Sequence, residues 1–315
     1  MPASTTPPTG VIGAALTPFT PDGTVNRARL DDLLDLLSGH CDAISVLGAE
    51  VTEYQVLGLR ERQEILSGAL DTVNKRVPVL AGVSHASATE VVRLAEHAAS
   101  AGANFAQVLI PRHPGGNPAS TTDLVTYFEQ IAAASPLPII AYHNPGQGTD
   151  ADVATMVELS TIDGIVGFKE SSRDLIKIGR LCAEIDEAGH ARYYTTMQAL
   201  LTTLTLGGSG AMMPPPGTIV GSRVVAAYRN GDHALAAQWQ KHFRIFPALW
   251  SKYGLTTTMK AAMGALGYDV GAPAAPFQPM PEHDAARLAR HLESLDLPAA
   301  LPNPAAPDTV KGATT

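Results

Sequence analysis

Two residues that can act together on a carbonyl compound stand at the ends of consecutive apolar segments. Lys169 follows residues 164–168, and Tyr142 closes residues 138–142. Burial among apolar residues disfavours the charged ammonium, and a neutral amine is what imine formation requires. A tyrosine phenol beside it can give and take the protons of that reaction. Position alone leaves two alternatives open: a Lys169 ammonium that reaches solvent, and a Tyr142 packed in the core.

These residues would be positioned by a repeating pattern of short apolar segments and longer amphipathic ones. Nearly continuous apolar segments are typical of parallel strands covered on both faces, and apolar residues three and four apart predict the helices between them. Eight alternating units favour an α/β fold closed into a (β/α)8 TIM barrel; an open doubly wound sheet is the alternative. The predicted strands are residues 11–16, 43–47, 77–81, 105–110, 138–142, 164–168, 192–195 and 210–213, and the eighth helix is 220–229.

The pattern also predicts how the chain is divided. Residues 1–8 are expected to be a flexible N-terminus and residues 9–230 the barrel. Residues 231–297 are expected to be a C-terminal helical extension, with helices near 233–250, 256–266 and 282–294. Residues 298–315 are rich in Pro, Ala and Thr, which predicts a disordered tail.

The composition excludes several classes of function. A net charge of −8 disfavours a nucleic-acid or anionic-membrane partner, because both need a basic surface. The two cysteines, Cys41 and Cys182, have no CxxC spacing, which disfavours a disulfide framework and a cysteine zinc site. No apolar run reaches the roughly 18 residues of a membrane span, and no secretory signal is visible. A soluble cytoplasmic protein is expected.

In a TIM barrel the catalytic residues lie at the carboxyl ends of the strands. Three such ends carry chemically useful residues: 48–53, 142–146 and 167–172. Strand alternation places Glu170 on the opposite face from Lys169. We therefore expect Glu170 to be a structural partner for groups on the helix side.

Five motifs in order carry a family resemblance. They are Leu16-Thr17-Pro18-Phe19 followed by Asp22-Gly23, Gly48 to Glu53-Tyr54, Tyr142-His143-Asn144-Pro145-Gly146, Val166-Gly167-Phe168-Lys169-Glu170-Ser171-Ser172, and Lys260-Ala261-Ala262. With these motifs, residues 9–297 resemble the dihydrodipicolinate synthase / N-acetylneuraminate lyase family of class I aldolase-type lyases.

The resemblance implies an imine between Lys169 and a 2-oxo acid, most often pyruvate, with Tyr142 as the proton shuttle. It implies a homotetramer or homodimer, small-molecule 2-oxo acid and aldehyde substrates, and no metal or organic cofactor. The expected reaction is C–C bond cleavage or condensation with an aldehyde. A dehydratase of a 2-oxo (sugar) acid by the same imine chemistry and a catalytically lapsed metabolite-binding barrel are the alternatives.

The stretch after the second predicted strand departs from the family pattern. The family usually has Gly-Thr-Thr-Gly-Glu there, which holds the substrate carboxylate, whereas this chain has Gly48, Ala49, Glu50, Val51, Thr52 and Glu53. Gly48, Ala49, Glu50 and Thr52 are retained as candidate substrate contacts. Glu50 could face the site, where it would repel a carboxylate unless protonated or paired, or it could face solvent.

Other loops depart as well. The family's relay tyrosine falls at residues 111–113, where His113 could carry protons and Arg112 could supply a positive charge, although both could be ordinary loop residues. Gln147 stands where true dihydrodipicolinate synthases have a carboxylate-binding arginine. Gly210 and Ala211 complete the candidate substrate contacts. Together with the residues 196–198 and 212–216, these departures disfavour lysine biosynthesis and sialic-acid cleavage and indicate a less polar pocket.

Overall fold

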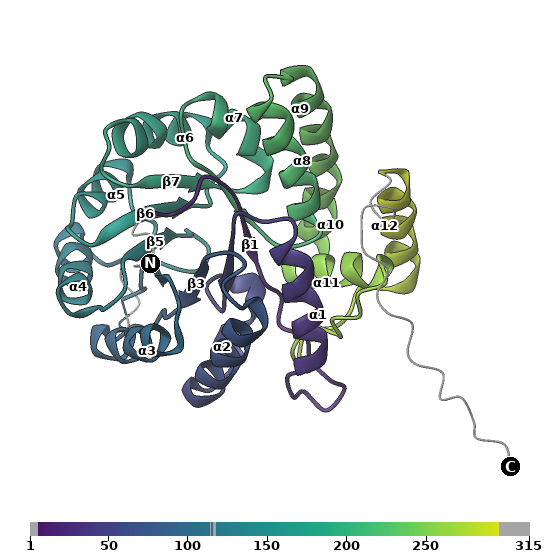
Figure 1. Cartoon of the computed structure of the whole chain (residues 1–315), viewed down its shortest axis with the longest axis horizontal. Coiled ribbons are helices and arrows are strands. Elements are labelled where there is room, and N and C mark those ends of the chain that lie inside the picture. Colours follow the sequence, from purple (N-terminus) through teal and green to yellow (C-terminus); the bar gives the residue numbers. More distant parts are fainter. Residues whose placement is uncertain (1–5, 114, 116–117, 296–315) are drawn as a thin grey trace, which may run out of the picture.

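The computed structural model describes residues 6–113, 115 and 118–295, and its centre is a closed barrel of eight parallel strands (Figure 1). Each strand pairs with the next in the chain, and β8 pairs with β1, which closes the barrel. The predicted TIM barrel is therefore confirmed, and the open sheet is excluded. The strands are β1 Gly10–Ala14, β2 Ala43–Val46, β3 Val79–Gly82, β4 Phe105–Leu109, β5 Ile139–His143, β6 Ile165–Glu170, β7 Arg192–Thr195 and β8 Gly210–Met213.

A helix follows each strand and covers the outside of the barrel (Figure 1). These helices are α1 Arg27–Ser38, α2 Leu59–Val73, α3 Ala88–Ala101, α4 Thr121–Ala134, α5 Val153–Ser160, α6 Leu175–Leu181, α7 Leu200–Thr205 and α8 Gly217–Arg229. Helices on the outside and side chains in the lumen bury both faces of the sheet, which is why the strands read as continuous apolar segments.

The helix α1 illustrates how the sequence specifies these elements. Asn26 caps it, because its side chain accepts a hydrogen bond from the Arg29 amide. Leu30, Leu33 and Leu37 recur at three- and four-residue spacing and are fully buried against the barrel. Each buried leucine contributes roughly 1.5–3 kcal/mol of hydrophobic stabilisation.

The C-terminal extension packs beside α8, which its first helix contacts (Figure 1). Residues 233–250 are helical as predicted, and they are divided into two α-helices joined by the short 3-10 helix Lys241–Arg244. Pro247 lies in the first turn of the second helix, where its missing N–H is tolerated, but it would interrupt a continuous helix. The helices of the extension are α9 His233–Gln240, α10 Ile245–Tyr253, α11 Leu255–Ala265 and α12 Glu282–Ser294.

Residues 6–8 fall within the predicted flexible N-terminus, yet they pack on the barrel. Pro7 is buried, and the Tyr194 hydroxyl donates to the Pro8 carbonyl at 2.8 Å. Residues 1–5 and the predicted tail 298–315 lie outside the described residues.

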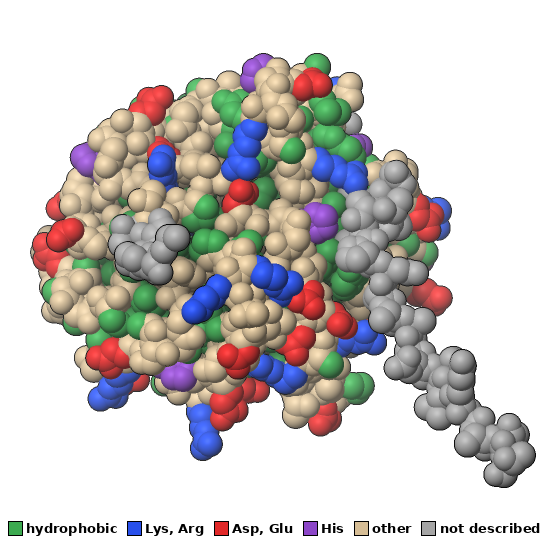
Figure 2. All heavy atoms as spheres, viewed as in Figure 1, with side chains coloured by type: hydrophobic (Ala, Val, Ile, Leu, Met, Phe, Trp, Pro, Cys, Tyr) green, Lys and Arg blue, Asp and Glu red, His purple; other side chains and the backbone are tan. Residues whose placement is uncertain are grey.

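The surface carries charges of both signs. Lys and Arg side chains are interspersed with Asp and Glu on the face shown in Figure 2. Among the described helices, none has the length and apolar character needed to cross a bilayer.

Candidate active site

Lys169 and Tyr142 are neighbours because their strands are neighbours. They are register partners in the β5–β6 pair, so both side chains point to the same face of the sheet. The Lys169 Nζ lies 3.9 Å from the centroid of the Tyr142 ring. Within the described part of the chain, no hydrogen bond or ion pair engages this Nζ, so the amine is available for chemistry.

The surroundings of Lys169 favour its neutral form. The residue is 5% exposed, and burial lowers the pKa of its amine from 10.5 to about 8. The negative charges of Glu50 and Glu170 oppose this shift, while the positive charge of Arg173 adds to it. Burial dominates, so the amine has the property that the sequence predicted for a Schiff-base lysine.

This shift predicts a pH dependence for imine formation. Only the deprotonated amine attacks a carbonyl, so the initial rate with pyruvate should rise about tenfold per pH unit below 8 and level off above it. The check is a series from pH 6 to 10, with aliquots quenched by borohydride and adducts quantified by mass spectrometry. A rate that keeps rising beyond pH 9.5 would mean that Lys169 titrates like an exposed lysine.

The Tyr142 hydroxyl makes two hydrogen bonds to side chains at the mouth of the barrel. It donates to Glu50 Oε2 and accepts a hydrogen bond from Asn144 Nδ2 at 2.9 Å. Burial, followed by the Glu50 charge, raises the pKa of the phenol well above 10. Tyr142 therefore stays protonated at neutral pH, so its hydroxyl has a proton to donate.

Glu50 reaches Tyr142 because the chain turns sharply after β2. A Cβ on Gly48 would lie 2.3 Å from Gln107 Oε1, so only glycine allows this close approach. The short 3-10 helix Glu50–Thr52 then places Glu50 at the barrel mouth. The buried Thr52 hydroxyl is committed to the Ala49 carbonyl at 2.6 Å, which leaves Glu50 as the polar side chain of this helix that faces the site.

A small cavity lies over Lys169, with a volume of ≈ 30 Å³. Glu50 belongs to its wall, whereas the 1% exposed Tyr142 does not. Loops after β2, β6, β7 and β8 contribute to the wall, and so does the C-terminal extension. The lining residues are Ala14, Glu50, Val51, Lys169, Ser171, Arg173, Thr196, Met197, Gln198, Met212, Met213, Pro214, Trp250 and Leu255.

Behind the reactive pair, Glu170 and His143 support the two strands from the opposite face. His143 Nδ1 lies 3.3 Å from Glu170 Oε1, and both side chains are fully buried. Burial alone would raise the pKa of Glu170, but hydrogen bonds from His143 and Ser172 outweigh it and lower that pKa. This geometry agrees with the predicted structural role of Glu170.

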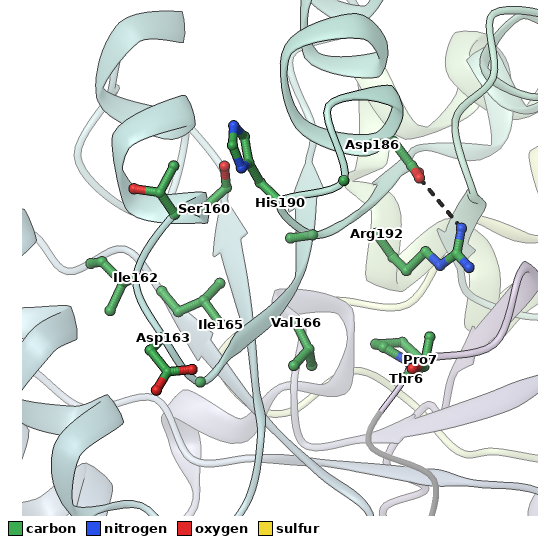
Figure 3. Close-up of a pocket in the computed structure, with 14 residues that line it drawn as sticks. Thr6, Pro7, Ser160, Ile162, Asp163, Ile165, Val166, Asp186, His190 and Arg192 are labelled. Atoms are coloured by element: carbon green, nitrogen blue, oxygen red, sulfur yellow. Dashed lines mark ion pairs between the residues drawn. The ribbon is translucent and has the colours of Figure 1, made fainter.

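A larger hollow of ≈ 650 Å³ lies at the other end of the barrel (Figure 3). Its wall includes the first residues of β6 and β7, and Arg192 in it pairs with Asp186 at 3.5 Å. The amino ends of TIM-barrel strands serve stability rather than catalysis. Because Lys169 lies near the carboxyl end of β6, the smaller cavity is the candidate active site.

Comparison with known proteins agrees with this geometry. The sequence model of the dihydrodipicolinate synthetase family matches residues 7–295. The chain belongs to the dihydrodipicolinate synthetase family. It is 30% identical over 292 residues to the 4-hydroxy-tetrahydrodipicolinate synthase of Methanococcoides burtonii, covering 91% of this chain and 98% of the relative.

The solved structures of this family show the same architecture. YagE from Escherichia coli K12, a family member solved in complex with pyruvate, is 29% identical and superimposes with a TM-score of 0.84. The superposition covers 92% of this chain and 99% of YagE. The chain studied is thus a lyase of the aldolase type, as the sequence predicted.

The predicted site residues do not all lie at the cavity of this family member. Lys169, Tyr142 and Glu50 are brought together, and Glu50 points into the site rather than to solvent. The other candidates lie outside its wall; they are Gly48, Ala49, Thr52, Arg112, His113, Gln147, Gly210 and Ala211.

The loop and strand candidates have other partners. Arg112 is exposed and donates to the Gly146 carbonyl at 3.1 Å, and His113 accepts from the Gly115 amide at 3.0 Å. Gly210 and Ala211 begin β8, whereas its carboxyl end and the following Pro214 reach the cavity.

Sequence reasoning missed Arg173 and Trp250. Arg173 stands four residues beyond Lys169 in the loop after β6, and its guanidinium lies 4.8 Å from the Trp250 ring centroid. An arginine in the loop directly after the reactive strand was the available signal for Arg173. Trp250 comes from the extension, and no spacing in the sequence connects it to the barrel mouth.

Proposed function

We propose that this protein forms a Schiff base between Lys169 and pyruvate or a related 2-oxo acid and uses it to break or form a carbon–carbon bond. The observation that carries this proposal is the buried, unpaired Lys169 amine beside the Tyr142 ring at the carboxyl end of the strands. The protonated imine withdraws electrons from C2, so a bond at C3 can break or form. The family relative YagE was solved with pyruvate, which supports this choice of substrate.

Protons move through Glu50 and Tyr142 in this proposal. When the enamine forms, the C3–H bond breaks, its electron pair becomes the C2=C3 bond, and the imine π pair moves to nitrogen. The proton passes to the Glu50 carboxylate, which faces the cavity and shares a hydrogen bond with Tyr142. The same carboxyl group returns a proton when an aldehyde is added.

Borohydride trapping with pyruvate tests the proposal. We expect a single adduct on the peptide that contains Lys169, located by mass spectrometry. Lys260 is the internal comparison, because it is also buried but pairs with Glu53 at 2.6 Å and donates to the Ala272 carbonyl. An adduct on Lys260, or none with any 2-oxo acid of a panel, refutes the imine mechanism.

We also propose that the chain works as a homotetramer or homodimer in the cytoplasm. Leu175 and Ile176 at the start of α6 are 63% and 80% exposed, which supports an apolar contact with a second copy.

A further inference from the structure

Three polar side chains are grouped on one part of the cavity wall. The Arg173 Nε donates to Gln198 Oε1 at 3.3 Å, which holds the guanidinium beside the amide. The Gln198 Nε2 is buried and, within the described residues, has no hydrogen-bond partner; the same holds for the Thr196 Oγ1, whose residue is 7% exposed. Buried polar groups are nearly always hydrogen bonded, so unpartnered ones in a cavity wall mark a place where a ligand supplies the partner.

Arg173 is an exposed cation at the rim of the cavity. No carboxylate lies within 4.0 Å of its guanidinium in the described part of the chain. The guanidinium packs over the Trp250 ring, which fixes its plane. Its backbone has φ 65°, a left-handed conformation that costs a non-glycine residue energy, so the surrounding structure must hold it in place.

The charges of the wall favour a monoanion. Arg173 is cationic, the imine of Lys169 becomes a cation when it is protonated, and Glu50 is the single carboxylate among the described lining residues. Glu50 already accepts the hydrogen bond from Tyr142, so its charge is partly compensated.

We propose that Arg173, Gln198 and Thr196 form the carboxylate-binding site for the 2-oxo acid, with the carboxylate held while the adjacent keto carbon reacts with Lys169. This inference rests on the proposed imine chemistry. A guanidinium, an amide N–H and a hydroxyl are all donors, and an ionised carboxylate accepts up to four hydrogen bonds. They supply side-chain donors that the stretch 48–53 does not offer, since its Thr52 hydroxyl is bound to the Ala49 carbonyl.

The test compares pyruvate with pyruvamide, which has a neutral amide in place of the carboxylate. Half-saturation for borohydride trapping of pyruvate should rise about 10- to 100-fold in Arg173→Met, because a charge-assisted hydrogen bond is lost. In the same variant, half-saturation for trapping of pyruvamide should change less than threefold. Thr196→Val and Gln198→Leu should each raise the pyruvate value about three- to tenfold.

Two further variants separate binding from folding. Arg173→Gly relieves the left-handed backbone and should fold at least as well as the wild type, yet show the same weakened pyruvate trapping. Arg112→Met removes an exposed arginine outside the cavity wall and should leave both values within twofold.

The outcomes are distinct. Equal weakening of pyruvate and pyruvamide in Arg173→Met would make Arg173 a structural residue and overturn the carboxylate site, as would unchanged pyruvate trapping. If pyruvate trapping is weakened in Arg112→Met and not in Arg173→Met, the carboxylate site lies in the loop after β4 and not at Arg173. Absence of any adduct in the wild type refutes the imine mechanism itself and is recognised before any variant is compared.

Discussion

Lys169→Ala should abolish trapping by pyruvate and lower turnover by about 10⁴-fold or more, while the protein folds normally. Removal of a covalent nucleophile eliminates the reaction path rather than weakening it. Stability should be unchanged or increased, because the substitution removes a buried amine that has no hydrogen bond within the described structure. Trapping, circular dichroism and thermal melting together check this prediction.

The control is the other buried lysine. Lys260→Ala leaves Glu53 buried without its partner, so it should lower the free energy of unfolding by about 3–5 kcal/mol while the folded fraction still forms the adduct. A Lys169→Ala protein that melts far below the wild type would contradict the view that this amine serves chemistry and not the fold.

Tyr142→Phe should still form the imine but should exchange the methyl protons of pyruvate with D2O about 10²- to 10⁴-fold more slowly. The exchange requires the enamine, so it reports proton transfer without any aldehyde substrate. Loss of a positioned acid–base group has an effect of this size. Proton NMR of pyruvate in D2O measures it, and an unchanged rate would mean that Glu50 or water transfers the proton without the phenol.

A double variant tests whether Tyr142 and Glu50 act as one relay. Glu50→Gln should slow the exchange about 10²-fold, Glu50→Asp should restore part of it, and Glu129→Gln on the exposed face of α4 should have no effect. In the double variant the losses should not multiply, because residues that act as a unit are not additive. Multiplied losses would mean that the phenol and the carboxylate work on separate steps.

The fold could be predicted from the sequence because barrel strands are continuous apolar segments separated by amphipathic helices. All eight strands lie where they were expected, with ends shifted by at most two residues. The helical region at 233–250 was also predicted, but its division into two helices was not, because the apolar spacing continues across the break. Pro247, which cannot lie inside a continuous helix without interrupting it, was the available signal.

The reactive pair could be predicted, but most of the cavity wall could not. The sequence places Lys169 and Tyr142 at the ends of consecutive strands, and the register of these strands makes the two residues neighbours. The conformations of the loops decide which other residues reach the cavity wall, and the hydrophobic periodicity of the sequence does not predict loop conformations. The sequence disfavoured dihydrodipicolinate synthesis partly because Gln147 offers no charge for a second carboxylate. Arg173 brings a cation to the cavity from a different loop, but that side chain is the one we assign to the 2-oxo acid, so the expectation stays a prediction.

The contribution of the C-terminal extension to the cavity has a consequence for engineering this enzyme. Trp250 and Leu255 form part of the wall, and the buried pairing of Lys260 with Glu53 ties their helices to the loop that carries Glu50. A library that randomises only the loops of the barrel would leave this wall unchanged. Transplanting the barrel without the extension would open the site to water. Selection for new aldehydes should therefore begin at Leu255, where size can change without touching the reactive amine or the Trp250 ring that packs on Arg173.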